Sequence, residues 1–119
     1  MKIERGDIFF ADLSPVFGAE IGGMRHVVVV QNNELNDEAS SNGGTVIVAP
    51  LSSNSMDVGA KNTMAMMPAD IPELSVFSYK ILLYEIRSID TRRLKNHIGR
   101  LSDETMAELD KKLKDALGL

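Results

Sequence analysis

The 119-residue sequence contains no cysteine and no tryptophan, and its two histidines are His26 and His97. Without cysteine there is neither a disulfide nor a thiolate metal site, so the reducing cytosol is the expected compartment. No apolar run approaches the ~20 residues that a membrane-spanning helix needs. The first residues also lack the apolar core of a secretory signal, so we expect a cytoplasmic protein without membrane contact.

An excess of positive charge is also missing. Lys and Arg number 13 against 17 Asp and Glu, which gives a formal net charge of −4. The molecule as a whole therefore does not attract polyanions, and a nucleic acid would have to bind at a local site. The simplest interpretation of most of the densest basic stretch is a solvated surface; its members are Arg87, Arg92, Arg93, Lys95 and Arg100.

Common signatures of metal and nucleotide chemistry are absent as well. The two histidines do not form a pair at metal-ligand spacing, and Gly22-Gly23 precede a predicted strand rather than a helix. There is no Gly-x-Ser-x-Gly motif. By elimination, an enzyme with this sequence would use no metal and no cofactor, and would depend on Arg, Ser or Thr, and acidic side chains.

Residues that favour β-structure dominate the first two-thirds of the chain. Strands are predicted at residues 8–13, 27–30, 45–51, 63–67 and 79–89. Loops or breaks are predicted at residues 14–24, 32–44, 54–61 and 68–72. The loop at 14–24 is long for a small domain, and such loops often carry function. Residues 91–98 have a different pattern, which we interpret as one or two helical turns.

A helix is predicted at the end of the chain. Ser102 is a good N-cap, Asp103 and Glu104 suit the first turn, and Gly118 stands where a helix ends. Its apolar residues recur at helical spacing: Met106, Leu109, Leu113, Ala116 and Leu117. One helix with one apolar stripe packs well on short strands. The prediction is a single mainly β (α+β) domain over residues 1–119, a strongly bent antiparallel β-barrel with a C-terminal helix.

Residues 5–33 carry a specific pattern, RGDIFFADLSPVFGAEIGGMRHVVVVQNN. It closely resembles the N-terminal signature of the MazF/PemK/Kid toxin family. In that family, Arg-Gly-Asp, an aromatic strand, Asp-Leu-x-Pro and Gly-x-Glu-x-Gly-x-Arg-Pro precede a valine-rich strand. Residues 45–52 and 81–90, Arg93-Leu94 and the C-terminal helix fit as well, so the resemblance covers nearly the whole chain.

The resemblance implies a fold and an activity. Members of the family are sequence-specific endoribonucleases that cut mRNA at short single-stranded motifs. Their fold is an SH3-like barrel with a C-terminal helix, assembled as a homodimer. A labile, acidic and partly disordered antitoxin covers the RNA site and keeps the toxin inactive. Cleavage resembles that of metal-free ribonucleases, in which the 2′-OH of the RNA attacks the phosphate.

The resemblance also points to catalytic residues. Arg25 matches the catalytic arginine of the family, and a fixed guanidinium suits the charge that develops on a phosphate during transfer. From the residues alone, a salt bridge from Arg25 to Glu20 or another acid is the more common arrangement. Ser52 matches a family threonine with a catalytic hydroxyl, although a serine at a strand end is more often a turn former. Whether Ser52 or Ser53 is the functional hydroxyl stays open.

Further positions are predicted to contact RNA. Glu20 matches a loop glutamate of the family, which would hold Arg25 or read a base edge; otherwise it is an exposed loop acid. Phe17 suits stacking on an unpaired base, or else plugs the end of the barrel. Asn32 matches a polar RNA-contact position of the family.

The sequence departs from the family pattern in three places. The family's proline after Arg25 is His26, which strand alternation directs to the opposite face, where we expect a dimer interface and sensitivity to pH. Glu85 replaces an RNA-contacting glutamine, and a carboxylate ~4 Å from a phosphate costs about 1 kcal/mol even in water. Either Arg87 on the same face neutralises Glu85, or Glu85 accepts from a base. The acidic loop at 33–44 is interpreted as a solvated surface.

Two other functions remain open from the sequence. CcdB-like toxins use the same barrel fold to bind DNA gyrase and cut nothing, but they resemble residues 5–33 far less. A non-catalytic relative that binds only an antitoxin or RNA is the other alternative, and it is kept open by Glu85 and His26.

Overall fold

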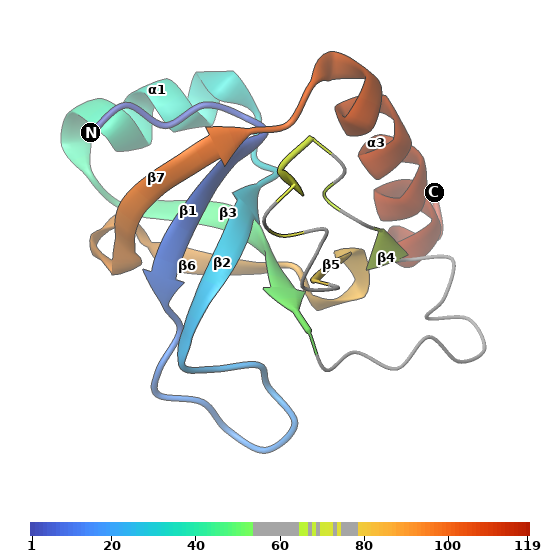
Figure 1. Cartoon of the computed structure of the whole chain (residues 1–119). Helices are drawn as coiled ribbons and strands as arrows, with labels where there is room; N and C mark the ends of the chain where they lie inside the picture. The colour runs from blue at the N-terminus through green and yellow to red at the C-terminus, as the bar shows by residue number, and fades with distance from the viewer. Residues whose placement is uncertain (54–64, 67, 69, 73, 75–78) are drawn as a thin grey trace.

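The computed structural model describes residues 1–53, 65, 66, 68, 70–72, 74 and 79–119 (Figure 1). Its strands are β1 (Asp7–Asp12), β2 (Met24–Val29), β3 (Thr45–Ser52), β4 (Ala65–Met66), β5 (Lys80–Leu82), β6 (Arg87–Asp90) and β7 (Leu94–Arg100). Its helices are α1 (Asn33–Asn42), the 3-10 turns η2 (Leu83–Glu85) and η3 (Thr91–Arg93), and α3 (Asp103–Leu117).

The strands form one bent antiparallel sheet. Its order is β4-β5-β3-β2-β1-β7, and β6 pairs with β3 beside this path. The predicted mainly β fold with a C-terminal helix is therefore confirmed, although β4 and β7 stand at the two ends of an open sheet. No helix among the described residues is both long and apolar enough to cross a bilayer.

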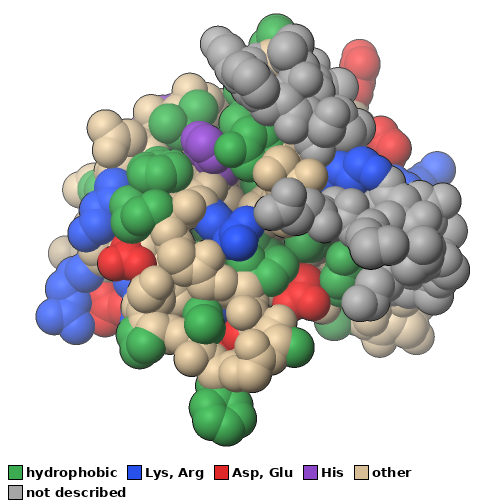
Figure 2. Space-filling view, turned by 60° about the horizontal axis from the view of Figure 1, so that its bottom comes forward, with side chains coloured by type: hydrophobic (Ala, Val, Ile, Leu, Met, Phe, Trp, Pro, Cys, Tyr) green, Lys and Arg blue, Asp and Glu red, His purple; other side chains and the backbone are tan. Residues whose placement is uncertain are grey.

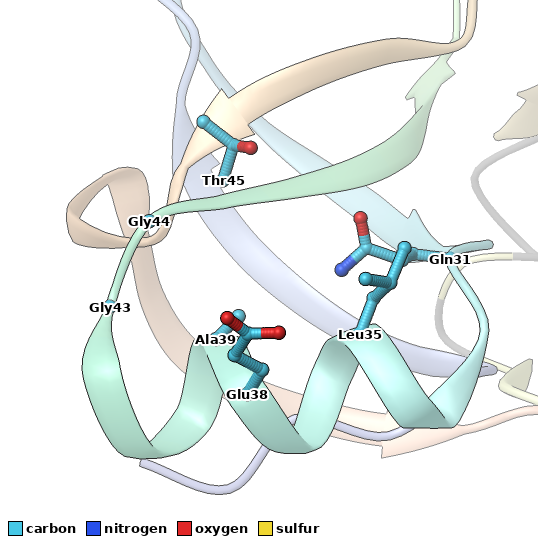
Figure 3. A pocket seen from close by; sticks show the side chains of 7 residues that line it. All are labelled: Gln31, Leu35, Glu38, Ala39, Gly43, Gly44 and Thr45. Atoms are coloured by element: carbon cyan, nitrogen blue, oxygen red, sulfur yellow. The ribbon is translucent and has the colours of Figure 1, made fainter.

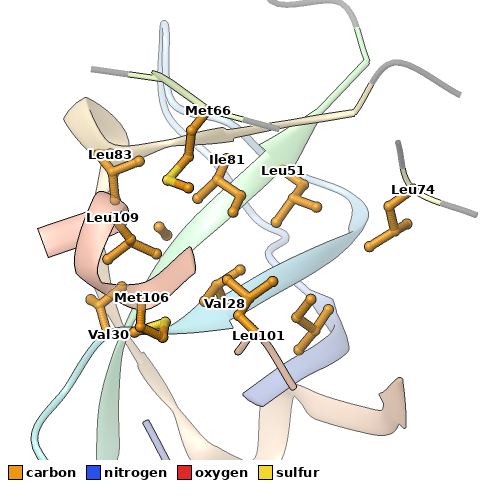
Figure 4. Packing of buried hydrophobic residues seen from close by; sticks show 12 residues of the cluster. Val28, Val30, Leu51, Met66, Leu74, Ile81, Leu83, Leu101, Met106 and Leu109 are labelled. Carbon is orange, nitrogen blue, oxygen red and sulfur yellow. The ribbon is translucent and has the colours of Figure 1, made fainter. Parts of the chain in front are cut away.

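The valine run of β2 and the residue after it connect two hydrophobic clusters. Alternation sends Val28 and Val30 to one face of the sheet and Val27 and Val29 to the other, as expected for a strand buried on both sides. Figure 4 shows the first cluster, in which side chains of α3 lie over the strands. The second cluster occupies the opposite face and includes Phe9.

Helix α3 matches the prediction at both ends. The Ser102 side chain accepts a hydrogen bond from the Thr105 N–H at 3.2 Å, and Gly118 closes the helix with φ 73°. Met106 and Leu109 are buried against the sheet. Full burial of one such side chain stabilises the fold by about 1.5–3 kcal/mol, so the apolar stripe anchors the helix.

The prediction of a loop at residues 32–44 is wrong, because the segment contains α1. Asn32 caps this helix by accepting from the Leu35 N–H at 2.9 Å. Asn36 is fully buried and donates to the Gln31 carbonyl at 2.8 Å. Polar contacts therefore help to attach the inner face of α1 to the rest of the protein. For this reason the segment lacks the apolar residues at helical spacing from which a helix is predicted.

Two predictions near residues 79–98 also need correction. The strand expected over 79–89 is interrupted by η2, whose buried Leu83 packs in the cluster beneath α3. Of the helical turns expected over 91–98, only η3 forms, and β7 then pairs with β1. Most of β7 after Leu94 is exposed, so its sequence shows no apolar alternation.

The remaining strand predictions agree approximately with the structure. β1, β2 and β3 lie within three residues of the expected bounds. β4 is a two-residue part of the strand expected at 63–67, and the loop expected at 54–61 lies outside the described residues.

Candidate functional site

The start of β2 and the end of β3 meet at one end of the sheet, beside the loop formed by residues 13–23. This loop lies at the bottom of Figure 1, and Figure 2 turns that end toward the viewer. The paired register of β2 and β3 ends at Val27 and Pro50, and continued by two residues it leads to Arg25 and Ser52. The Arg25 Nη1 lies 3.4 Å from the oxygen of Leu51, the residue before Ser52. The two residues predicted to be catalytic are therefore close to each other where β2 begins and β3 ends.

Arg25 is half-buried and fixed by main-chain carbonyls. Its Nε donates to the Gly22 oxygen at 2.8 Å, and its Nη1 lies 3.4 Å from the Leu51 oxygen. Carbonyl acceptors orient the guanidinium but leave its charge in place. The salt bridge to Glu20 considered from the sequence does not form, because the Glu20 Oε1 accepts from the Phe17 N–H at 2.6 Å.

Ser52 lies between two basic residues. It is 6% exposed, and its partner on β5 is Lys80. Cross-strand partners share a face, so Ser52 and Lys80 lie side by side, with backbones ~4.8 Å apart at strand spacing. Alternation along β2 and β3 puts Arg25 on the face of Val27 and Ser52 on the face of Val48, which belong to one hydrophobic cluster, so Arg25, Ser52 and Lys80 form one row across β2, β3 and β5. Ser53 is exposed just beyond the end of β3.

Sequence reasoning missed Lys80. It stands at the start of a segment rich in β-forming residues, with nothing nearby in the sequence that relates it to Arg25. Only the register that pairs β3 with β5 brings it to this row. A lysine that begins a strand is a weak signal by itself.

Arg87 adds a third basic group on the same face. It pairs with Val48 of β3, which belongs to the second hydrophobic cluster, and its Nη1 donates to the Ile21 oxygen at 3.2 Å. Arg25 and Arg87 thus donate to the adjacent carbonyls of Gly22 and Ile21. Two guanidinium groups are therefore held at the same end of loop 13–23.

Of the two alternatives for Glu85, the ion pair with Arg87 does not form. Glu85 ends the 3-10 turn η2, so the strand alternation that would place the two side chains together is broken. No ion pair joins Glu85 and Arg87. The pKa of the neighbouring Tyr84 is raised by burial and further by the charge of Glu85.

Phe17 projects from loop 13–23 with 87% of its surface exposed. Its interpretation as a plug for the barrel end is therefore wrong, and an exposed ring is available for stacking. Glu20, which bonds to the Phe17 backbone, is likewise exposed in this loop.

Asn32 lies far from Arg25, and the His26 side chain points away from it. Asn32 follows Arg25 by seven residues and lies past the other end of β2. At strand spacing, seven residues span ~20 Å. The Asn32 Oδ1 caps α1. His26 faces the opposite side of β2, as alternation predicts, with ring centroids 5.1 Å from Phe10 and 5.6 Å from Tyr79. Burial lowers the pKa of His26.

The cavity shown in Figure 3 is separate from this end of the sheet. It has a volume of about 270 Å³ and lies between α1 and the start of β3. The Gln31 amide that lines it is already bonded, through Nε2 to Asn36 and through Oε1 to the Ile47 N–H. Within the described ranges, no cluster of three or more His, Asp or Glu side chains could hold a metal ion.

Comparison with known proteins places the chain in a family. The model of PemK-like, MazF-like toxins of type II toxin–antitoxin systems matches residues 4–117. MazF from Deinococcus radiodurans has a TM-score of 0.78 at 22% identity, and the alignment covers 100% of this chain and 99% of that one. The MazE–MazF complex from the same organism gives 0.72 at 21% identity, with coverage of 100% and 99%.

A mycobacterial endoribonuclease in complex with its cognate antitoxin also shares the fold. Its TM-score is 0.70 at 17% identity, over 98% of this chain and 96% of that one. The family match spans nearly the whole sequence and includes Arg25, Ser52 and Arg87. The chain therefore belongs to the PemK-like, MazF-like toxins of type II toxin–antitoxin systems.

Proposed function

We propose that this protein is a sequence-specific endoribonuclease that cuts single-stranded RNA without a metal or cofactor. The observation that carries the proposal is the row of Arg25, Ser52 and Lys80, with Arg87 on the same face. A hydroxyl between two basic residues, one of them held by main-chain carbonyls, suits a reaction in which negative charge builds up on a phosphate. The fold relationship to a mycobacterial endoribonuclease supports the same activity.

In the proposed reaction the RNA supplies the nucleophile. The 2′-oxygen forms a bond to phosphorus and loses its proton, while the bond from phosphorus to the 5′-oxygen breaks and that oxygen takes up a proton. The products are a 2′,3′-cyclic phosphate and a 5′-hydroxyl. No external oxidant, water or metal is needed to balance this step.

Arg25 is assigned to stabilise the negative charge on the non-bridging oxygens of the phosphate. Its Nε and Nη1 are bound to carbonyls in the free protein, which fixes the plane of the guanidinium and leaves its positive charge available. Ser52 is assigned to donate to the phosphate or to orient the 2′-OH. Its position opposite Arg25 favours it over the exposed Ser53.

Contacts to bases are proposed for loop 13–23 and its surroundings. Phe17 offers an exposed ring for stacking on an unpaired base. Glu20 and Glu85 carry acceptors that suit base amino groups, and Arg87 offers charge to the backbone. Asn32 stays a weaker assignment, because its side chain caps α1 at the far end of β2.

The proposal also includes partners. The antitoxin complexes of the related Deinococcus and mycobacterial proteins support a cognate antitoxin as partner. We propose that this antitoxin is acidic and covers the basic row. We further propose a homodimer of one-domain protomers that acts in the cytoplasm. His26, half-buried with Phe10 and Tyr79, lies on the face opposite Arg25 and is proposed to lie near the dimer contact.

Cleavage of a long single-stranded RNA in EDTA tests the activity. Wild-type protein is expected to produce discrete cuts. The cleavage rate of Arg25→Ala should be about 10²–10³-fold lower, the usual effect of removing one donor to a developing oxyanion. Arg25→Lys keeps the charge but loses the planar fork, so it should also cut poorly. Lys111→Ala, which removes an exposed charge from α3, is the matched control.

Cutting by the Arg25→Ala variant at the wild-type rate would contradict the assignment of Arg25. A folded wild-type protein that leaves the RNA intact would contradict the nuclease proposal itself. That result would favour the gyrase-binding or non-catalytic alternatives.

A further inference from the structure

A second basic pocket lies beside η3 and the start of β7, the strand at one end of the sheet. It has a volume of about 290 Å³ and is lined by Asp12, Asp90, Arg92, Arg93 and Lys95. Three basic and two acidic side chains give it a net charge of +1. The protein as a whole carries −4, so this pocket is a local exception to the overall charge.

Strand pairing connects this pocket to the candidate active site. Ala11 of β1 is the partner of Arg25 on β2 and also of Leu94 on β7. Two strand spacings therefore separate the backbones of Arg25 and Leu94, about 10 Å. Arg93 and Lys95, on either side of Leu94, line the pocket. Because Ala11 shares the face of Arg25, alternation directs Asp12, which also lines the pocket, to the other face of the sheet. An RNA strand that leaves the Arg25 row therefore reaches the pocket by passing over β7, the strand at the end of the sheet.

Figure 2 shows basic side chains in separate groups at the end of the molecule that carries loop 13–23, with acidic side chains among them. A strand of nucleic acid that crosses this end can therefore meet more than one group of cations.

The positive charge of the pocket is only partly neutralised. Asp90 accepts from Nε and Nη2 of Arg92, both at 3.0 Å, so these two charges offset each other. Arg93 instead donates to the carbonyls of Asp12 and Ser14. The Lys95 ammonium donates to the Arg92 carbonyl at 3.2 Å. Carbonyl oxygens orient these two groups without cancelling their charge.

We propose that this pocket binds a phosphodiester of the RNA strand beside the point of cleavage, on the β7 side. The inference rests on the proposed ribonuclease function and adds a subsite to it. Contacts to phosphate fix the register of a strand and carry no base information. The pocket therefore strengthens binding of RNA that extends past the cleavage motif on one side, whatever its sequence there.

Equilibrium binding of the full-length protein to RNA tests the subsite. The probes are single-stranded RNAs that carry the mapped motif with a 2′-deoxy nucleotide at the cut, extended on the 5′ side, on the 3′ side or on neither. Wild-type protein should gain affinity from only one of the two extensions. Lys95→Gln should lose that gain and lower the salt slope of log K by about 0.7, the value for one phosphate contact in a single strand.

Two further variants serve as a control and as a change of opposite sign. Lys111→Gln removes the same charge from the exposed face of α3 and should bind as wild type does. Asp90→Asn keeps an oxygen that caps η3 but removes a negative charge from the pocket. It should bind the extended RNA more tightly and steepen the salt dependence, the opposite of Lys95→Gln.

The outcomes separate the subsite from the nuclease. If wild-type protein cuts RNA but Lys95→Gln and Lys111→Gln bind the extended RNA equally well, the subsite is wrong and the ribonuclease stands. If wild-type protein neither binds nor cuts RNA, both fail. If Lys95→Gln binds RNA normally but loses binding of polyglutamate, the pocket serves an acidic protein segment and the phosphate assignment is overturned.

Discussion

At the scale of single residues, Asp7 is the most fully enclosed acidic group that the structure describes. Only 2% of it is exposed, and its carboxylate accepts from Arg100 Nε at 2.8 Å and from the Glu4 N–H at 2.8 Å. The His97 Nε2 lies 3.1 Å from the same carboxylate. Asp7 therefore ties the start of β1 to β7 and contributes to the fold rather than to the candidate site.

Asp7→Asn should reduce the free energy of unfolding by about 1–3 kcal/mol, because an amide cannot replace all the bonds of a buried carboxylate. The loss stays modest since Arg100 is half-exposed and its charge can return to water. Urea denaturation measures the change, and Glu108→Gln on the exposed side of α3 is the control. Equal midpoints for the two variants would show that Asp7 has no structural role.

His26 makes the stability of the fold depend on pH. Burial lowers its pKa below the ordinary value of 6.5, so the unfolded chain binds a proton more readily than the folded protein. Stability therefore rises with pH between the folded-state pKa and 6.5. The contribution is fully present above pH 6.5 and is lost as the pH falls toward the folded-state pKa.

The substitution His26→Phe tests this effect. The new ring keeps the contact with Phe10 and Tyr79 and removes the titrating group. Urea denaturation at pH 8 and pH 5 should show a smaller loss of stability on acidification in the variant than in wild type. An equal loss in both proteins would mean that other groups account for the pH dependence.

At the scale of elements, loop 13–23 is held by arginines from three strands or turns. Arg93 binds the carbonyls of Asp12 and Ser14 at one end, and Arg87 and Arg25 bind carbonyls at the other. The loop also closes on itself through the Leu13 N–H and the Gly23 oxygen, 2.9 Å apart. These contacts position the Phe17 and Glu20 side chains relative to the basic row.

Arg87→Met should loosen this loop without disturbing the helix on the other face. The variant loses the bond to the Ile21 carbonyl but keeps most of the aliphatic stem. Hydrogen exchange should become several-fold faster for amides of residues 13–23 and stay unchanged in α3. Unchanged exchange in the loop would show that Arg25 and Arg93 hold it without Arg87.

Elements with a strong apolar pattern were predictable, and polar ones were not. The run Val27 to Val30 predicts a strand buried on both faces, and the stripe beginning at Met106 predicts α3 with its cap at Ser102. Helix α1 was missed because Asn36 fills its buried face through hydrogen bonds. Strand β7 was missed because its side chains after Leu94 are mostly exposed at the end of the sheet.

At the scale of the whole molecule, the basic row depends on contacts between distant parts of the chain. Arg25 and Ser52 could be proposed from the resemblance, because each occupies a recognisable position in a motif. Lys80 could not, since only the pairing of β3 with β5 brings it beside Ser52. The overall charge of −4 gives no indication of this site, because three cations are gathered on one face by strand register.

The central claim is that this row cleaves RNA through the RNA's own 2′-OH. The most direct test incubates wild-type protein in EDTA with two RNAs of one sequence, one of which has a single 2′-deoxy nucleotide at a mapped cut. We expect that cut to disappear while every other cut remains and ends in a 2′,3′-cyclic phosphate. Continued cutting at the deoxy position, or cutting that requires added metal, would contradict the account.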